Sequence, residues 1–178
     1  GSPTYTAFGS HNHTFVNSGL TDLTFTISLN AITSNGCSGS GTGTLEVFHR
    51  PTADFSVTAL QGCTPLSVIF TNTGSGSITA TDWKFGNGDT SINTIAAATF
   101  TNGAGSAAKK FITTLVVTTN KGCKDSAKKE LMVYPQPQAA FSADTPACSP
   151  GLVRFDNRST GAADFRWNFG DGETSQAD

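Results

Sequence analysis

The sequence predicts an all-β chain built of repeated antiparallel β-sandwiches, and three observations support this prediction. A nine-residue motif that begins at Trp83 returns 84 positions later, beginning at Trp167. Gly, Pro, Thr, Ser and Asn interrupt every window long enough to hold a helical period. Short runs rich in β-branched and aromatic residues lie between turn signals, and six or seven such runs in about 86 residues are typical of a sandwich.

The repeat also predicts the domain organisation. Pro51 and Pro137 lie 86 positions apart, as do several other landmarks, so the repeating unit is about 86 residues long. If units begin near these prolines, residues 51–136 form one complete unit. Residues 1–50 are then the C-terminal half of a preceding unit, and residues 137–178 are the N-terminal half of a following one. We therefore interpret the chain as a segment of a longer tandem array.

In the complete unit we expect six strands. They are residues 53–59, 66–72, 80–85, 95–101, 110–119 and 126–134. In the half-unit before it, Phe25, Ile27 and Leu29 alternate with polar residues, which indicates a strand with one buried face. The equivalent run of the complete unit should face the core with Phe111, Thr113, Leu115 and Val117. In the second strand, the residues expected to point inward are Leu66, Val68 and Phe70.

Asn87-Gly88 and Asp171-Gly172 are strong hairpin signals, because a type I′ turn needs positive φ at both central residues. Trp83 and Phe85 lie two positions apart on one strand face just before the turn. We interpret them as core anchors, and the rival interpretation is a surface platform on which sugars stack. The residues assigned to the repeated structural motif are Trp83, Phe85, Gly86, Gly88, Trp167, Phe169, Gly170, Asp171 and Gly172.

The motif Trp-x-Phe-Gly-Asp-Gly followed by Thr-Ser, at residues 167–175, resembles the hallmark of polycystic kidney disease (PKD) domains. The resemblance covers essentially the whole chain and implies an immunoglobulin-like β-sandwich, strung in extracellular arrays as a spacer or adhesive module. The version with a Cys before the second strand is most similar to repeats in large surface proteins of gliding bacteria exported by the type IX route. Other segments that carry the resemblance are Ala53-Asp54-Phe55, Cys63 to Leu66, Val68 to Asn72, Asn120 to Cys123 and Leu131 to Pro135.

The four cysteines of this Ser- and Thr-rich chain indicate disulfides formed in an oxidising compartment. Turn residues flank both Cys63 and Cys123, so we place the two cysteines in loops at one end of the sandwich. We expect them to form a structural disulfide, since both fall within the complete unit. Cys37 and Cys148 occupy the same two positions in the half-units, so we expect their partners outside this chain or in a second molecule.

Composition and motifs argue against several function classes. Only 13% of the residues are charged and the formal net charge is -2, which is typical of an extracellular β protein and unlike a nucleic-acid-binding one. No apolar run of about 18 residues occurs, so no membrane span is expected in this segment. The three histidines are scattered, and no nucleophile, base and orienting group can be assembled from the sequence. We expect no enzyme activity and no cofactor.

No metal site is expected either. Carboxylates that cluster near the two Gly-rich hairpins could in principle bind calcium, but calcium prefers about six to eight convergent oxygens, so we interpret them as solvated turn residues. These carboxylates are Asp82, Asp89, Asp164 and Asp171.

The expected function is that of a non-catalytic extracellular structural or adhesive module in a tandem-repeat surface adhesin or filament, in which identical chains could assemble head to tail. The alternative is an accessory carbohydrate- or protein-binding module of a secreted hydrolase. The expected partners are neighbouring repeats or identical chains, with surface polysaccharide or other proteins as further candidates.

Overall fold

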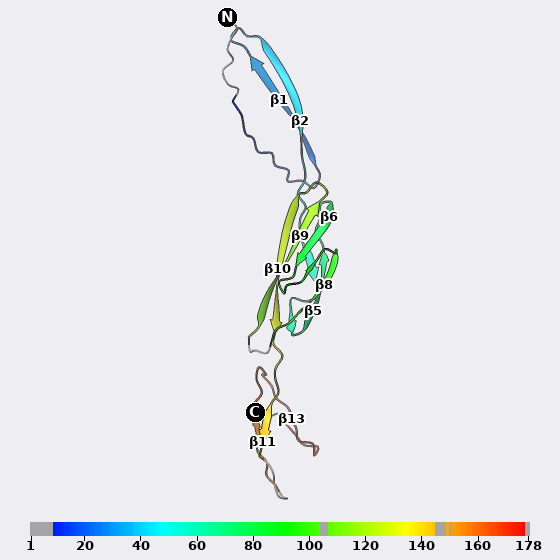
Figure 1. Ribbon diagram of the computed structural model, residues 1–178, viewed down its shortest axis with the longest axis vertical. Helices are drawn as coiled ribbons and strands as arrows, with labels where there is room; N and C mark the ends of the chain where they lie inside the picture. Colours follow the sequence, from blue (N-terminus) through cyan, green and yellow to red (C-terminus); the bar gives the residue numbers. More distant parts are fainter. Residues whose placement is uncertain (1–8, 104–106, 145–148, 150, 177–178) are drawn as a thin grey trace.

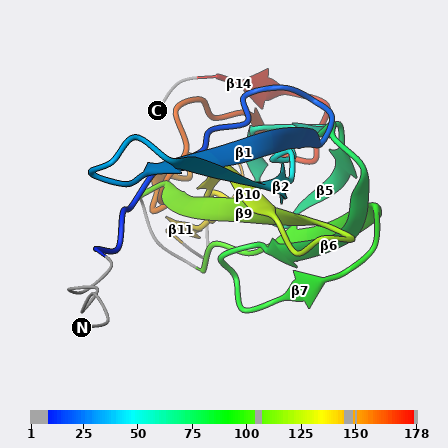
Figure 2. The ribbon, with the colours of Figure 1, turned by 90° about the horizontal axis from the view of Figure 1, so that it is seen from above.

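A computed structural model of the chain describes residues 9–103, 107–144, 149 and 151–176, and within these ranges it contains strands and turns but no helix. The all-β fold predicted from the sequence is confirmed. Three parts follow one another along the longest axis (Figure 1): an N-terminal hairpin, a central sandwich and a set of short C-terminal strands. Viewed from above along this axis, the three parts project over one another (Figure 2).

The central part consists of two facing sheets. The strand bounds are β3 Phe55–Val57, β4 Gln61–Cys63, β5 Leu66–Asn72, β6 Ile78–Lys84, β7 Thr90–Ser91, β8 Ile95–Phe100, β9 Lys109–Thr119 and β10 Lys124–Tyr134. One sheet has the order β4-β10-β9-β6-β7 and the other has the order β3-β5-β8. Neighbouring strands are antiparallel, except that β4 runs parallel to β10. This is the immunoglobulin-like sandwich that the resemblance implied.

Each of the six predicted runs overlaps a strand of the structure, and the run 66–72 coincides with β5. Strand β4, which has three residues and includes Gly62, was not predicted from the sequence. So short a strand carries no alternation to detect, and its partner β10 is distant in the sequence.

The core between the two sheets is rich in aromatic side chains. Trp83 is 0% exposed, and its ring centroid lies 5.1 Å from that of Phe55 and 5.7 Å from that of Phe70. The indole Nε1 of Trp83 donates a hydrogen bond of 2.8 Å to the carbonyl of Asn93, so the one polar atom of this buried ring has a partner. The burial predicted for Trp83 is confirmed, and a sugar-stacking role for this residue is excluded by it.

The alternation predicted for the long strand β9 is confirmed as well. Phe111, Leu115 and Val117 are buried, while Ile112 between them is half exposed. Thr113 is also buried, and its hydroxyl donates to the carbonyl of Phe85 at 3.3 Å, which satisfies a polar group inside the core.

The hairpin between β6 and β7 is present, but the predicted type I′ turn is wrong. Gly86 and Gly88 have positive φ angles of 84° and 104°, whereas Asn87 between them does not have a positive φ. The loop is closed by the N–H of Phe85, which donates to the carbonyl of Asp89 at 3.2 Å. Asn87 instead uses its side chain, whose oxygen accepts a bond of 2.9 Å from the N–H of Asp89.

The N-terminal hairpin consists of β1 Leu23–Ile32 and β2 Ser38–Val47. It has the same register as the β9–β10 hairpin, because Leu23 pairs with Val47 as Lys109 pairs with Val133. The two turns match too. In each turn a threonine N–H donates to the carbonyl of a cysteine, at 2.8 Å for Cys37 and 3.0 Å for the equivalent turn of the central sandwich.

The C-terminal part repeats the beginning of the central sandwich. Its strands are β11 Phe141–Ala143, β12 Phe155–Asn157, β13 Trp167–Asn168 and β14 Thr174–Ser175. Phe141 pairs with Asn157, and Trp167 pairs with Ser175. These pairs are the counterparts of Phe55 with Asn72 and of Trp83 with Ser91. The division into one complete unit and two half-units at residues 50 and 136 remains a prediction, to which these matching registers give support.

Replacing Trp83 by Ala should lower the free energy of unfolding of the central sandwich by about 3 to 5 kcal/mol, because the change leaves a large cavity. Urea denaturation followed by circular dichroism measures this loss. The matched control is Ile92→Ala, since Ile92 is 79% exposed and should change stability by less than about 0.5 kcal/mol. Equal effects of the two substitutions would contradict the core role of Trp83.

Replacing Gly86 by Ala should destabilise the hairpin more than replacing Gly88 does. Both glycines have positive φ, which costs an L residue about 1 to 2 kcal/mol. A Cβ on Gly86 would also lie 2.7 Å from the carbonyl oxygen of Ile112, whereas a Cβ on Gly88 would meet nothing within 4 Å. The difference between the two unfolding free energies isolates this close approach, and a larger loss for Gly88→Ala would refute it.

Candidate functional site

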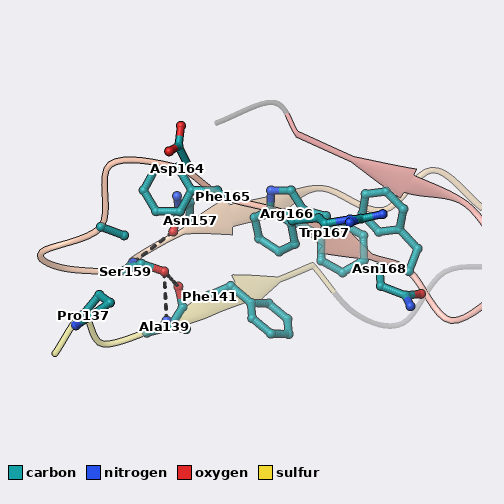
Figure 3. A pocket seen from close by; sticks show the side chains of 14 residues that line it. Pro137, Ala139, Phe141, Asn157, Ser159, Asp164, Phe165, Arg166, Trp167 and Asn168 are labelled. Atoms are coloured by element: carbon teal, nitrogen blue, oxygen red, sulfur yellow. Dashed lines mark hydrogen bonds between the residues drawn. The ribbon is translucent and has the colours of Figure 1, made fainter. Parts of the chain in front are cut away.

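The strongest candidate site is an open groove of about 560 Å³ in the C-terminal part (Figure 3). Its apolar lining consists mainly of aromatic side chains. Phe141 comes from β11, Phe155 from β12 and Trp167 from β13, and Phe169 follows β13 directly. We call these four side chains the aromatic face.

The rings of this face have the geometry of the central core. The ring centroids of Phe141 and Trp167 are 5.4 Å apart, and those of the equivalent Phe55 and Trp83 are 5.1 Å apart. Trp167 stacks on Phe169 with an interplanar angle of 8°, and the equivalent stack on Trp83 has an angle of 10°. The aromatic face is therefore preorganised as one half of a sandwich core.

The two sets of rings differ in how far other side chains cover them. Phe141 is 63% exposed whereas Phe55 is 1% exposed, and Phe155 is 38% exposed whereas Phe70 is 0% exposed. In the central sandwich, strand β9 pairs with β6 and its apolar side chains close the core above the rings. Among the described residues, no strand other than β14 pairs with β13. The groove is thus the uncovered core face of the predicted half-unit.

The predicted disulfide between Cys63 and Cys123 is wrong. Cys63 is the Cα partner of Tyr134 at the C-terminal end of β10, whereas Cys123 directly precedes the N-terminal end of the same strand. Strand β10 has 11 residues and therefore separates the two cysteines by about 35 Å. A disulfide needs Cα atoms within about 7 Å. The turn residues around each cysteine were correctly recognised, but they belong to opposite ends of the sandwich.

Cys37, Cys63 and Cys123 are all unpaired thiols in the described part of the chain. Cys37 lies in the turn between β1 and β2 and is exposed. Cys148 lies outside the described residues, so its expected partner outside the chain or in a second molecule remains a prediction, as does that of Cys37.

A second site, which the sequence analysis did not predict, lies where the N-terminal hairpin joins the central sandwich. The backbone N–H of His49 donates to Asp22 Oδ1 at 2.9 Å, and Nδ1 of the same histidine lies 2.6 Å from this oxygen. The backbone hydrogen bond, and next the imidazole, hold the pKa of Asp22 below its ordinary value. This pair holds the two ends of the β1–β2 hairpin together at its base. The two residues are far apart in sequence, so no local pattern could have indicated the contact.

The same joint also contacts the turn between β9 and β10 and the first residue of β10. The ammonium group of Lys121 lies 4.7 Å from the ring centroid of Phe48, and Arg50 Nε donates to the carbonyl of Lys124 at 3.1 Å. The chain that enters the central sandwich is therefore fixed to the sandwich by side-chain contacts as well as by the backbone.

The described residues bring no group of three or more His, Cys, Asp or Glu side chains together in a way that could hold a metal ion. They also contain no helix of the length and apolar character that crossing a membrane requires.

No protein-family model and no curated protein sequence matches this chain, whereas several solved structures do. The PKD1 domain of the metalloprotease PrtV from Vibrio cholerae is 31% identical, over 48% of this chain and 99% of that domain, with a TM-score of 0.41. The PKD1 domain of Epp from Vibrio anguillarum is 22% identical, over 49% of this chain and 98% of that one, with a TM-score of 0.40. A structure described as carbohydrate-binding modules from the β-sandwich superfamily is 18% identical over 54% of this chain and 46% of its own, with a TM-score of 0.44.

Two facing sheets around an aromatic core define the central part as an immunoglobulin-like β-sandwich. The 31% identity to the PrtV domain extends over almost the whole of that domain. This chain carries the Trp-x-Phe-Gly motif twice, at residues 83–86 and 167–170.

The Asp22 contact predicts a pH dependence. Because the pKa of Asp22 is lowered in the folded state, its carboxylate stabilises the joint at pH values above about 4, the ordinary value for Asp, and this contribution is lost as the pH falls through the lowered pKa. Asp22→Asn should therefore lower the midpoint temperature of unfolding at pH 7. At pH values below the lowered pKa of Asp22, the same substitution should leave this temperature nearly unchanged. The control is Glu46→Gln, on the exposed surface of β2. A difference between Asp22→Asn and the parent that is constant with pH would contradict the prediction.

Proposed function

We propose that this chain is a non-catalytic extracellular module with a structural or adhesive role, and that it is one segment of a tandem-repeat rod in a surface adhesin or filament. The observation that carries the proposal is the construction of the same aromatic arrangement twice. It is covered in the central sandwich and open in the C-terminal part, with ring distances that agree within a few tenths of an ångström.

The joint gives the proposal a physical basis. Phe48 contacts Lys121 at the entrance to the central sandwich. The equivalent of Phe48 is Tyr134, which lies where the chain leaves the sandwich toward residue 137. If each unit holds the linker that precedes it in this way, successive units stack end to end with limited bending. The elongated arrangement of the three parts along one axis agrees with such a rod (Figure 1).

An extracellular location is part of the proposal. It is supported by the low content of charged residues and by the abundance of Thr, Ser and Gly on short strands. It is also supported by the similarity to a domain of a bacterial metalloprotease.

The second candidate, an accessory carbohydrate-binding module, is favoured by one observation, namely the open groove that contains Trp167. Aromatic rings on a protein surface can stack on sugars. The equivalent ring, Trp83, is fully buried in the central sandwich, however, where β9 pairs with the strand that carries it.

One experiment separates the two functions. Affinity electrophoresis of the dilute chain in gels that contain soluble polysaccharides should show unchanged mobility, and small-angle X-ray scattering of the same sample should show an elongated particle. The matched variants are Trp167→Ala in the groove and Ile92→Ala on the central sandwich. Retardation by a polysaccharide that Trp167→Ala abolishes and Ile92→Ala preserves would favour the carbohydrate-binding module and refute the structural role.

A further inference from the structure

We propose that the aromatic face of one molecule is covered by the β1–β2 hairpin of a second copy of the same chain. This inference rests on the proposed structural function and adds the partner and the mode of assembly. The central sandwich serves as an internal template, because it shows how a hairpin of this kind covers a face of this kind.

The first step is the equivalence of the two hairpins. In the central sandwich, β9 and β10 contribute the buried side chains of Phe111, Leu115, Leu131 and Val133 to the core. The equivalent side chains of the N-terminal hairpin are those of Phe25, Leu29, Leu45 and Val47. Both hairpins have the same strand register and the same turn hydrogen bonds, so the N-terminal hairpin presents its apolar side chains with the spacing of the template.

The second step is that most of this apolar side of the hairpin is uncovered. The ring of Phe25 packs against that of Phe15, whose centroid lies 5.0 Å away, but the other apolar side chains of this side are largely exposed. Leu29 is 71% exposed, whereas its equivalent Leu115 is 0% exposed. Ile27 and Leu45 are also exposed, and they lie on the same side of the hairpin. A single hairpin is at best marginally stable in water, so this side requires a partner surface.

The third step is the register of the contact. In the template, Trp83 pairs with Leu115 and Lys84 with Thr114 across the β6–β9 ladder. Transferred to the equivalent residues, this ladder pairs Trp167 of one molecule with Leu29 of the second copy, and Asn168 with Ser28. The contact therefore adds backbone hydrogen bonds of an edge strand to the burial of the rings.

The fourth step is the direction of assembly. The hairpin and the aromatic face lie at opposite ends of the molecule, with the central sandwich between them (Figure 1). One molecule cannot bring its own two surfaces together in this arrangement. The contact is heterologous, so each added copy presents a new free face and the assembly grows as a linear chain.

The arrangement also indicates which cysteines lie near the junction. Cys123 and Cys63, the sequence equivalents of Cys37 and Cys148, lie at opposite ends of the central sandwich. In the assembly the turn that contains Cys37 contacts the linker after Tyr134 of the preceding molecule, as the turn at Lys121 contacts Phe48. Tyr134 pairs with Cys63, so Cys37 of one copy comes close to Cys63 of the other.

The test uses the full chain and two matched substitutions. Leu29→Asp places a charge on the covering side of β1, and Ile32→Asp places one on the opposite side of the same strand, at a residue that is 72% exposed. Sedimentation velocity and electron microscopy should show concentration-dependent linear assemblies for the parent and for Ile32→Asp. Leu29→Asp should raise the concentration needed for assembly by at least about tenfold. A parent that remains monomeric, or equal effects of both substitutions, would overturn the proposal.

A mixing experiment distinguishes the loss of the proposed contact from misfolding of one variant. Phe141→Asp damages the aromatic face and leaves the hairpin intact, whereas Leu29→Asp does the reverse. Neither variant should assemble alone, and an equimolar mixture should form a one-to-one dimer that does not grow. Larger assemblies in the mixture, or the absence of any dimer, would count against the inference.

Cross-linking tests the polarity. Copies that retain only Cys37, mixed with copies that retain only Cys63, should be joined by a short bis-maleimide into a covalent dimer. Copies that retain only Cys37, mixed with copies that retain only Cys123, should not be joined, because these two turns lie one unit apart. The reverse result would overturn the junction. A monomeric chain that is elongated and binds no polysaccharide would refute self-assembly alone and leave the proposed structural function standing.

Discussion

The burial of aromatic side chains between two facing sheets is the interaction on which the rest of this structure depends. Removing a large apolar side chain from water contributes about 1.5 to 3 kcal/mol, so four such rings contribute an amount comparable with the whole stability of a typical domain. Phe55, Phe70, Trp83 and Phe85 realise this contribution in the central sandwich because β9 covers them. The equivalent rings of the C-terminal part have the same geometry without the cover, and their stability depends on what is placed above them.

Much of the fold could be predicted because it follows from local sequence patterns. The alternation of Phe25, Ile27 and Leu29 in the preceding half-unit correctly placed the equivalent Leu115 in the core. The Trp motif correctly located a hairpin and a buried Trp83. Positions of cysteines could not be predicted in the same way. Turn residues around Cys63 and Cys123 indicate that each cysteine lies at a strand end. Which end of the sandwich each one occupies depends on the direction of its strand. For Cys63 this direction is set by the parallel pairing of β4 with β10, which cannot be seen in the local sequence.

The joint between the hairpin and the sandwich shows a different limit. Asp22 and His49 are separated by the whole β1–β2 hairpin, and neither belongs to a repeated motif. The groove, by contrast, could be predicted in part, because the sequence identified Trp167 and Phe169 as repeat equivalents of core residues. Comparison of the two copies within one structure was needed to show that their rings are already arranged as in the covered core.

The parallel and antiparallel ladders of β10 have a mechanical consequence. This strand runs nearly the length of the central sandwich, pairs with β9 over ten residues and with β4 over three, and leads directly into the next part of the chain. Tension along the long axis would draw β10 along its own direction, while the hydrogen bonds to both neighbours lie across that direction. These hydrogen bonds would then be loaded together in shear and would not break one after another. A rod of such units is suited to transmitting a pulling force, with β10 as the element that bears it in each unit.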